Sequence, residues 1–131
     1  MANNATGTFQ VKLTPEQDQT GEAVVGRMTI DKQFEGDIEG NSKGLMLMVG
    51  TAVAGSAGYV ALEKVSASIG GRQGTFYFQH HGIMNRGEGT LSVVVVPDSG
   101  TDALIGLSGS MQIKIEEGKH FYDFEYTIAD A

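Results

Sequence analysis

Two neighbouring histidines, His80 and His81, are the residues of this chain that first suggest metal binding or acid–base chemistry. Adjacent residues of a β-strand point to opposite faces of the sheet, so the two imidazoles cannot bind one metal ion unless a bulge separates them. The sequence also lacks the His-Glu-x-x-His pattern and the spaced His-x-His with a following glutamate that mark common metal sites. We therefore predict no metal site and no cofactor.

Glu63 is a second candidate, because this carboxylate interrupts an otherwise apolar strand face. If Gly70-Gly71 forms a two-residue turn, Glu63 lies opposite Phe78 and diagonal to His80, whereas a four-residue loop puts it directly opposite His80. A three-residue loop would bring Glu63 to the side of His81 instead. We expect one of the first two arrangements, with His80 in the interior beside Glu63 and His81 outside.

A carboxylate on an apolar face needs a partner, because burying an unpaired charge is costly. An imidazole beside it gives a pair suited to general acid–base catalysis, or a structural pair that fixes the register of the strands. Lys32 is a third possible member. A two-residue Glu35-Gly36 turn would pair Lys32 with Glu39 on the surface, whereas a three-residue loop would turn it inward toward Gly40.

The elements that must position these side chains are β-strands. Glycine occurs 19 times and falls mainly between apolar stretches, which is typical of hairpin turns. Period-two alternation with β-branched and aromatic residues predicts strands near 7–13, 24–34, 38–49, 58–69, 75–84, 90–96, 110–116 and 119–128. Successive hairpin strands with one apolar face usually close on themselves, because closure removes the exposed edges. We predict an all-β fold, an eight-stranded antiparallel up-and-down barrel forming one domain over residues 1–131, with a two-sheet sandwich as the alternative.

The connections allow the register to be predicted as well. A two-residue Glu117-Gly118 turn pairs Ile115 with His120 and Met111 with Phe124, so that apolar positions meet. This register leaves Phe121 on a polar surface, where it is a candidate subunit contact. Longer connections are expected at residues 14–20 and 97–109, the second with a short helical turn around residues 102–105.

Charge and composition exclude several classes of function. The chain has 16 acidic and 9 basic residues, a formal net charge of −7, and its basic residues are scattered singly. Such a chain repels the phosphates of nucleic acids and the headgroups of anionic membranes. It has no cysteine, no apolar run near the roughly 18 residues of a membrane span, and an N-terminus unlike a secretion signal. We expect a cytoplasmic protein that binds neither nucleic acid nor membrane.

Several segments together carry a resemblance to a known family. They are Gly7-Thr8-Phe9-Gln10-Val11-Lys12, Met28-Thr29-Ile30-Asp31-Lys32-Gln33-Phe34, Gly58-Tyr59-Val60-Ala61-Leu62-Glu63-Lys64-Val65, Phe78-Gln79-His80-His81-Gly82, Val95-Val96-Pro97-Asp98-Ser99-Gly100-Thr101 and Lys119-His120-Phe121-Tyr122-Asp123-Phe124-Glu125-Tyr126. The chain resembles a bacterial family of small, functionally uncharacterised domains with an allene oxide cyclase-like, calycin-like barrel. The resemblance implies an eight-stranded antiparallel barrel and a homodimer. It implies no reaction, and no catalytic residue is carried over from it.

Three hypotheses for function remain at this point. The leading one is noncatalytic binding of a small apolar or amphipathic molecule in the barrel mouth; the candidate binding residues are Lys32, Met46, Tyr59, Glu63, Phe78, His80, Tyr122 and Tyr126. The alternative is an isomerase, cyclase or lyase with Glu63 or His80 as the general base and one of the tyrosines Tyr59, Tyr122 and Tyr126 as a hydrogen-bond donor. The third is a dimeric domain that takes no ligand and acts through its surface.

Overall fold

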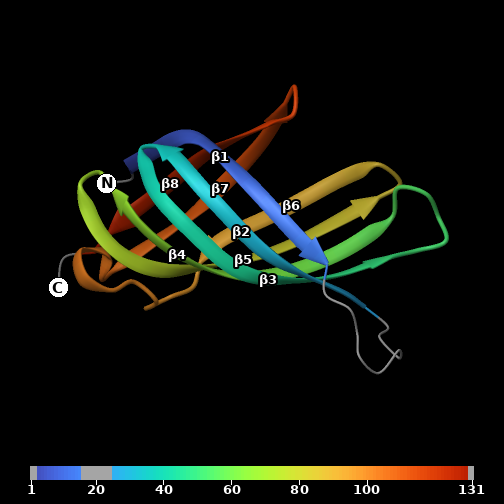
Figure 1. Ribbon diagram of the computed structural model, residues 1–131, viewed down its shortest axis with the longest axis horizontal. Coiled ribbons are helices and arrows are strands. Elements are labelled where there is room, and N and C mark those ends of the chain that lie inside the picture. Colours follow the sequence, from blue (N-terminus) through green and yellow to red (C-terminus); the bar gives the residue numbers. More distant parts are fainter. Residues whose placement is uncertain (1–2, 16–24, 130–131) are drawn as a thin grey trace.

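The computed structural model describes residues 3–15 and 25–129, which form a closed antiparallel barrel with the strands in chain order (Figure 1). Its elements are β1 (Asn3–Pro15), β2 (Gly26–Gly36), β3 (Ile38–Gly50), β4 (Ala57–Ile69), β5 (Arg72–Asn85), β6 (Glu88–Val95), the 3₁₀ turn η1 (Asp102–Leu104), β7 (Leu107–Glu116) and β8 (Lys119–Ile128). The predicted barrel is confirmed, and the sandwich is excluded because the sheet closes through the pairing of β1 with β8. None of the described residues forms a helix long and apolar enough to cross a membrane.

Two tight turns set the registers on which the interior depends. Gly70 and Gly71 both have positive φ angles, 57° and 83°, and Ile69 pairs with Arg72. A two-residue turn of this kind requires positive φ at both central positions, which glycine adopts without strain. Glu117 and Gly118 do the same between β7 and β8, so the two-residue turn predicted there is confirmed, and at Gly70-Gly71 the two-residue turn is found out of the two loop lengths that were expected.

The register between β2 and β3 differs from both predictions. Lys32 pairs with Ser42, rather than with Glu39 or Gly40. The reason is that the chain turns a corner here: β2 continues along β1 to Gly36, which pairs with Gly7 and has a φ of +106°. Of the two positions that the sequence left open for Lys32, the inward one is found, and its side chain is buried.

The connection between β6 and β7 covers one end of the barrel. It spans residues 96–106, slightly earlier than the predicted 97–109, and contains the expected short helical turn η1. The N–H of Thr101 donates to the carbonyl of Thr75 in β5, and this contact holds the connection against the barrel. Leu104 is fully buried as a result. We call this end the closed end.

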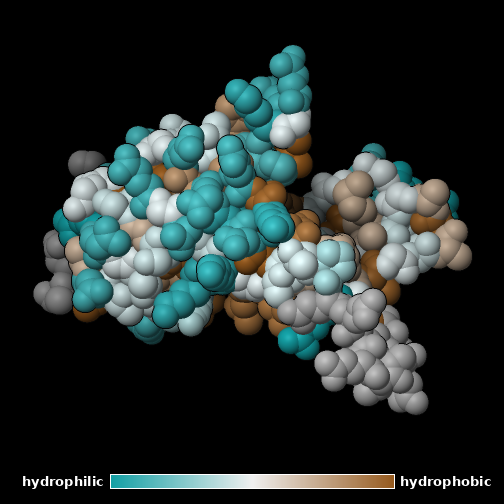
Figure 2. Space-filling model, viewed as in Figure 1, coloured by the Kyte–Doolittle hydropathy of each residue, from teal (hydrophilic) through white to brown (hydrophobic). Residues whose placement is uncertain are grey.

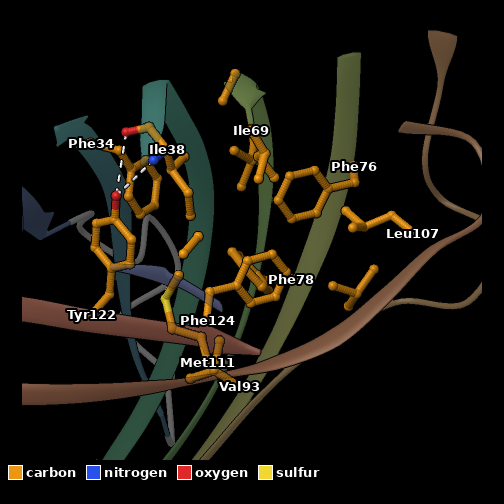
Figure 3. Packing of buried hydrophobic residues seen from close by; sticks show 14 of the residues in the cluster. Phe34, Ile38, Ile69, Phe76, Phe78, Val93, Leu107, Met111, Tyr122 and Phe124 are labelled. Carbon is orange, nitrogen blue, oxygen red and sulfur yellow. Dashed lines mark hydrogen bonds between the residues drawn. The ribbon is translucent and has the colours of Figure 1, made fainter. Parts of the chain in front are cut away.

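The interior of the closed end is packed with aromatic side chains. Three phenylalanine rings point toward one another (Figure 3): Phe76, Phe78 and Phe124. The ring centroids of Phe76 and Phe78 are 4.9 Å apart, and those of Phe78 and Phe124 are 5.4 Å apart. Both contacts are edge-to-face, at an interplanar angle of 82°, which is a favourable arrangement of aromatic rings. This cluster is the main hydrophobic core.

The opposite end of the barrel, which we call the open end, is much less filled. Among the described residues β6 and β7 pair at a single position, Val94 with Ser110, and beyond it the two strands diverge toward this end (Figure 1). A small second cluster of Ile30, Met46 and Ala61 lies on this side. Met84 alternates with the buried His80 along β5, but its side chain is 43% exposed because it lies where the strands spread apart.

Candidate functional site

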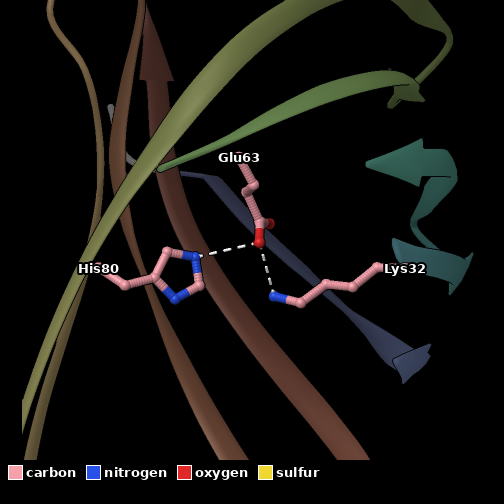
Figure 4. A network of polar contacts seen from close by, with 3 residues as sticks. All are labelled: Lys32, Glu63 and His80. Atoms are coloured by element: carbon pink, nitrogen blue, oxygen red, sulfur yellow. Dashed lines mark ion pairs between the residues drawn. The ribbon is translucent and has the colours of Figure 1, made fainter. Parts of the chain in front are cut away.

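A polar cluster lies in the barrel interior, among side chains that are otherwise apolar. Lys32 of β2, Ser42 of β3, Glu63 of β4 and His80 of β5 are all buried, with Glu63 only 1% exposed. Their strands are consecutive in the sheet, and each side chain occupies an inward position of its strand. Figure 4 shows the Lys32 ammonium and the His80 ring approaching the Glu63 carboxylate from opposite sides.

One oxygen of Glu63 is in contact with both partners. Lys32 Nζ lies 2.9 Å from Glu63 Oε2, and His80 Nε2 lies 3.2 Å from the same atom. Both are ion-pair distances, and among the described residues the other carboxylate oxygen, Glu63 Oε1, and Ser42 Oγ have no hydrogen-bond partner. Buried polar atoms are normally paired, so this cluster has hydrogen-bonding capacity to spare.

The electrostatics of the cluster keep Glu63 ionised. Burial by itself would raise the pKa of the Glu63 carboxyl, but contact with His80 and the positive charge of Lys32 outweigh burial and hold that pKa below its ordinary value. Lys32 Nζ also lies 4.8 Å from the centroid of the Phe9 ring, a cation–π distance. The ammonium is therefore stabilised on two sides although it is buried.

A glycine makes room for the buried glutamate. Gly44 pairs with Glu63, and a Cβ at position 44 would collide with the carbonyl oxygen of Leu62 and with the Cα and Cβ of Glu63. The φ angle at Gly44 is not in the left-handed region, so the space and not the backbone angle requires glycine. Close approach of two strands at a glycine allows the carboxylate to be placed inside.

Tyr59 links the cluster to the open end. Its ring lies against Gly82, where a Cβ would overlap the tyrosine ring, and its centroid is 6.4 Å from that of His80. Burial raises the pKa of the Tyr59 hydroxyl, and the negative charge of Glu63 raises it further. The hydroxyl therefore stays protonated at neutral pH and can donate a hydrogen bond.

A cavity of about 600 Å³ opens beside Tyr59 at the open end. Its walls come from the ends of β3, β4, β5 and β6. Inward positions of these strands form most of the walls, namely Met48, Gly50, Ala57, Tyr59, Gly82, Met84, Gly89 and Leu91, and the outward positions between them, Val49, Gly58, Ile83 and Thr90, also border the cavity. Only Tyr59 and Thr90 among these lining residues carry a side-chain oxygen or nitrogen atom; the others are apolar residues or glycine. The concave shape between the diverging parts of the molecule, with hydrophobic side chains inside it, is visible in Figure 2.

The structure brings together most of the residues predicted as a site. Lys32, Glu63 and His80 form the cluster, and His81 is exposed on the outer face, as expected. Phe78 lies directly under His80, with ring centroids 6.3 Å apart. Met46 pairs with Ala61 and belongs to the small apolar cluster near the open end.

Two predicted binding residues lie elsewhere. The Tyr122 hydroxyl is engaged at the closed end, where it accepts a hydrogen bond from the N–H of Ile38 at 2.8 Å and donates one to the carbonyl of Glu35 at 3.0 Å. Tyr126 stacks on Phe124, with centroids 5.2 Å apart. Tyr122 therefore ties the β2–β3 corner to β8, and neither tyrosine contributes to the cavity walls.

Ser42 and the cavity glycines were not predicted. Ser42 alternates with Met46 and Met48 along the same strand, so its inward position was available from the sequence once the strand was assigned. The cavity glycines lie one on each of four neighbouring strands, β3 to β6, near the same end: Gly50, Gly58, Gly82 and Gly89. This grouping becomes visible only when the registers are known. Within residues 3–15 and 25–129, no group of three or more His, Asp or Glu side chains is arranged to hold a metal ion.

The chain is similar to proteins whose function is unknown. A family model described as protein of unknown function (DUF3224) matches residues 5–126. A crystal structure of a protein of unknown function from the same family, from Shewanella oneidensis MR-1, matches with 50% sequence identity and a TM-score of 0.92, over 100% of both chains. No curated protein matches. The expected membership of an uncharacterised bacterial family is thus confirmed, whereas the likeness to allene oxide cyclases stays a prediction.

Proposed function

The chain belongs to the DUF3224 family, whose function is unknown, and from its own cavity we propose that it binds a small apolar or amphipathic molecule at the open end of the barrel. The observation that carries this proposal is the cavity of about 600 Å³ with almost entirely apolar walls. Pockets for small molecules commonly have volumes of about 300 to 1,000 Å³ and mostly apolar linings with a few polar groups.

The side chains around the cavity favour an adaptable apolar ligand. Met48 and Met84 line it with flexible thioethers, and methionine adjusts to ligands of different shape. The glycines among the wall residues add no side-chain volume, which keeps the space between the strands open. An apolar molecule here would cover the exposed side chains of Leu91 and Met84.

The polar end of an amphipathic ligand would meet Tyr59. Tyr59 lines the cavity, and its ring also lies against the ring of His80. The protonated Tyr59 hydroxyl can donate a hydrogen bond to a neutral group such as a hydroxyl or an amide, and the net charge of −7 on the chain disfavours an anionic headgroup. Glu63 and His80 would then act by fixing Tyr59 and its surroundings.

Acid–base catalysis by Glu63 or His80 is the alternative, and it has less support. A general base works best when its pKa lies near the operating pH, whereas the contacts of Glu63 lower its pKa. The same contacts with Lys32 and His80 also occupy the carboxylate from two sides. These observations favour a supporting role for the cluster over a direct role in a reaction.

The test uses the neutral apolar dye N-phenyl-1-naphthylamine, whose fluorescence rises in apolar surroundings, followed by its displacement with 1-dodecanol. We expect saturable binding and displacement. Replacing Gly50 with phenylalanine should weaken binding at least tenfold, because a Cβ at this cavity wall meets no atom within 4 Å and the added ring can occupy the cavity. Gln10→Phe on the exposed face of β1 is the matched control and should bind as the wild type does. Equal binding by Gly50→Phe and wild type would contradict the proposal.

A further inference from the structure

The outer face of β3, β4, β5 and β6 is unusually apolar. Cross-strand pairing aligns its outward side chains in three rows: Leu45, Leu62, Gln79 and Val94; Leu47, Val60, His81 and Ser92; Val49, Gly58, Ile83 and Thr90. None of these twelve positions holds Asp, Glu, Lys or Arg, although the chain has 25 such residues in total, 16 acidic and 9 basic. We call this surface the apolar outer face.

The large side chains of this face are open to solvent. Val60, Leu62 and Ile83 are 53%, 55% and 55% exposed, and Leu47, Val49 and Val94 are exposed as well. A half-buried sheet normally alternates apolar inward residues with polar outward residues, and here both sides of the strands are apolar. Folding of a single chain gives no reason for apolar residues at these positions, because their side chains stay exposed to solvent after folding.

The rest of the barrel exterior follows the normal pattern. Outward positions of β1 and β2 are polar, for example Gln10, Lys12, Asp31 and Gln33, and those of β7 include Ser110, Gln112 and Lys114. Figure 2 shows the mainly hydrophilic surface over β1 and β2. Phe121, the subunit contact expected from the sequence, is only half-buried among such residues, between Lys114 on β7 and Thr8 on β1. Single apolar side chains such as Ile105 and Ile115 are exposed elsewhere, but among the described strands the adjoining rows of outward apolar side chains lie on β3 to β6.

With a rim of one residue on every side, this face approaches the size of one side of a protein interface. Four strands about 4.8 Å apart and five residues about 3.3 Å apart cover roughly 300 Å² in projection, and one further residue on every side extends this to about 650 Å². Each partner of a standard interface contributes about 800 Å² of accessible surface. Apolar patches of several hundred Å² on soluble proteins commonly mark interaction sites.

We propose that this face binds the same face of a second copy of the chain, with a two-fold axis that lies in the interface and crosses the strands over the row of Val60 and His81. The charges at its two ends favour this axis. Lys64 follows Leu62 at one end, and Glu88 precedes Thr90 at the other. An axis crossing the strands places the lysine end of one copy over the glutamate end of its partner, whereas an axis along the strands would place like ends together.

The shape of the apolar outer face also suits self-association. A groove of about 230 Å³ lies near the axis, with Leu47, Val60, Leu62 and His81 among its lining residues. In a two-fold pair, the same row of each copy meets its counterpart, so a side chain from one copy can fill the groove of the other. The net charge of −7 makes an anionic membrane or a nucleic acid a poor occupant of this face.

The absence of cysteine allows a direct test, because a single introduced thiol is unique. Val60→Cys should be joined into a covalent dimer by a short bis-maleimide at micromolar protein concentration, since two Val60 positions face each other across the axis. Ile105→Cys is the matched control, because Ile105 is 62% exposed and lies outside the face. It should stay monomeric on a denaturing gel. Equal cross-linking of the two variants would overturn the proposed geometry.

The oligomeric state gives a second measurement. By light scattering after gel filtration, the wild type should have twice the mass of the chain, and Val60→Lys should shift the population to monomers by raising the dissociation constant at least a hundredfold. Ile105→Lys should remain dimeric, and near-ultraviolet circular dichroism checks that each variant is folded. A monomeric wild type at 100 μM, or a dimer that Val60→Lys leaves intact, would overturn the proposal; a monomer that retains apolar-dye binding at this face would identify a different occupant.

Discussion

The two ends of the barrel interior are built from the same strands and yet are filled differently. At the closed end, Phe76, Phe78 and Phe124 pack edge to face, and Leu104 from the β6–β7 connection covers them. At the open end, the interior positions hold mainly methionine, alanine and glycine, with Ile30, Tyr59 and Leu91 among them, and a cavity of about 600 Å³ remains. An eight-stranded barrel is just wide enough either to be filled by side chains or to hold one small ligand. In this chain, side chains fill the closed end, and the open end leaves room for a small ligand.

The polar cluster lies between the packed closed end and the cavity at the open end. Lys32, Glu63 and His80 lie where the aromatic core gives way to the methionines, and their ion pairs replace apolar packing. Such a pair adds little net stability compared with apolar residues, but removing one partner is costly. The contrast between the two ends therefore predicts that stability depends on the closed end and the intact cluster, and binding on the open end.

The largest expected effect is the loss of a ring from the closed end. Phe78→Ala should lower the free energy of unfolding by about 4 kcal/mol, because it removes a fully buried side chain and leaves a cavity. Met84→Ala at the open end should change it by less than about 0.5 kcal/mol, because this side chain is 43% exposed. Urea denaturation measures both. Similar losses for the two variants would remove the distinction between the ends.

The next effect concerns the cluster. Glu63→Gln should destabilise the fold by about 3 kcal/mol, because it leaves Lys32 charged and buried without its anionic partner. Adding Lys32→Met should recover most of that loss, since the isolated charge is then gone. Glu116→Gln is the matched control: its ion pair with Lys114 is also 2.9 Å long but largely exposed, so the change should stay within about 0.5 kcal/mol. A double variant as unstable as Glu63→Gln would contradict this account.

A smaller effect is expected from two glycines of β3. Gly44→Ala should cost about 2 kcal/mol, because its Cβ collides with the backbone of β4 at Glu63. Gly50→Ala should be nearly neutral, because the new Cβ meets no atom within 4 Å. Thermal unfolding of both variants measures the difference. If Gly44→Ala were as stable as Gly50→Ala, the close approach of the strands beside the cluster would not be needed.

The smallest effect is a dependence on pH. Because the folded chain lowers the pKa of Glu63, ionised Glu63 contributes stability above its ordinary pKa, and that contribution is lost as the pH falls through the lowered pKa. The wild type should therefore lose more stability between neutral and acidic pH than the Lys32→Met, Glu63→Gln double variant. Denaturation at a series of pH values tests this. Parallel pH profiles would mean that the folded and unfolded chains hold the Glu63 proton equally well.

The alternation of residues was enough to determine much of this protein. It indicated the barrel, the tight turn at Glu117-Gly118, a hairpin at Gly70-Gly71 of two or four residues, and the placement of His80 inside and His81 outside. These features are local: a two-residue turn fixes the register of its own hairpin, and the period of two then assigns each side chain to a face.

Contacts between distant segments decided the rest. Lys32 joins Glu63 because β2 runs past the expected turn to pair with β1, and a corner of that kind is set by the closing of the barrel and the bridge from Tyr122 to Ile38. Tyr122 and Tyr126 lie at the closed end, and the open end exists because β6 and β7 diverge beyond Val94. Strand periodicity assigns a side chain to the inside or the outside of a barrel. Its depth along the barrel axis depends on the registers of all eight strands together, and only the tertiary structure supplies these.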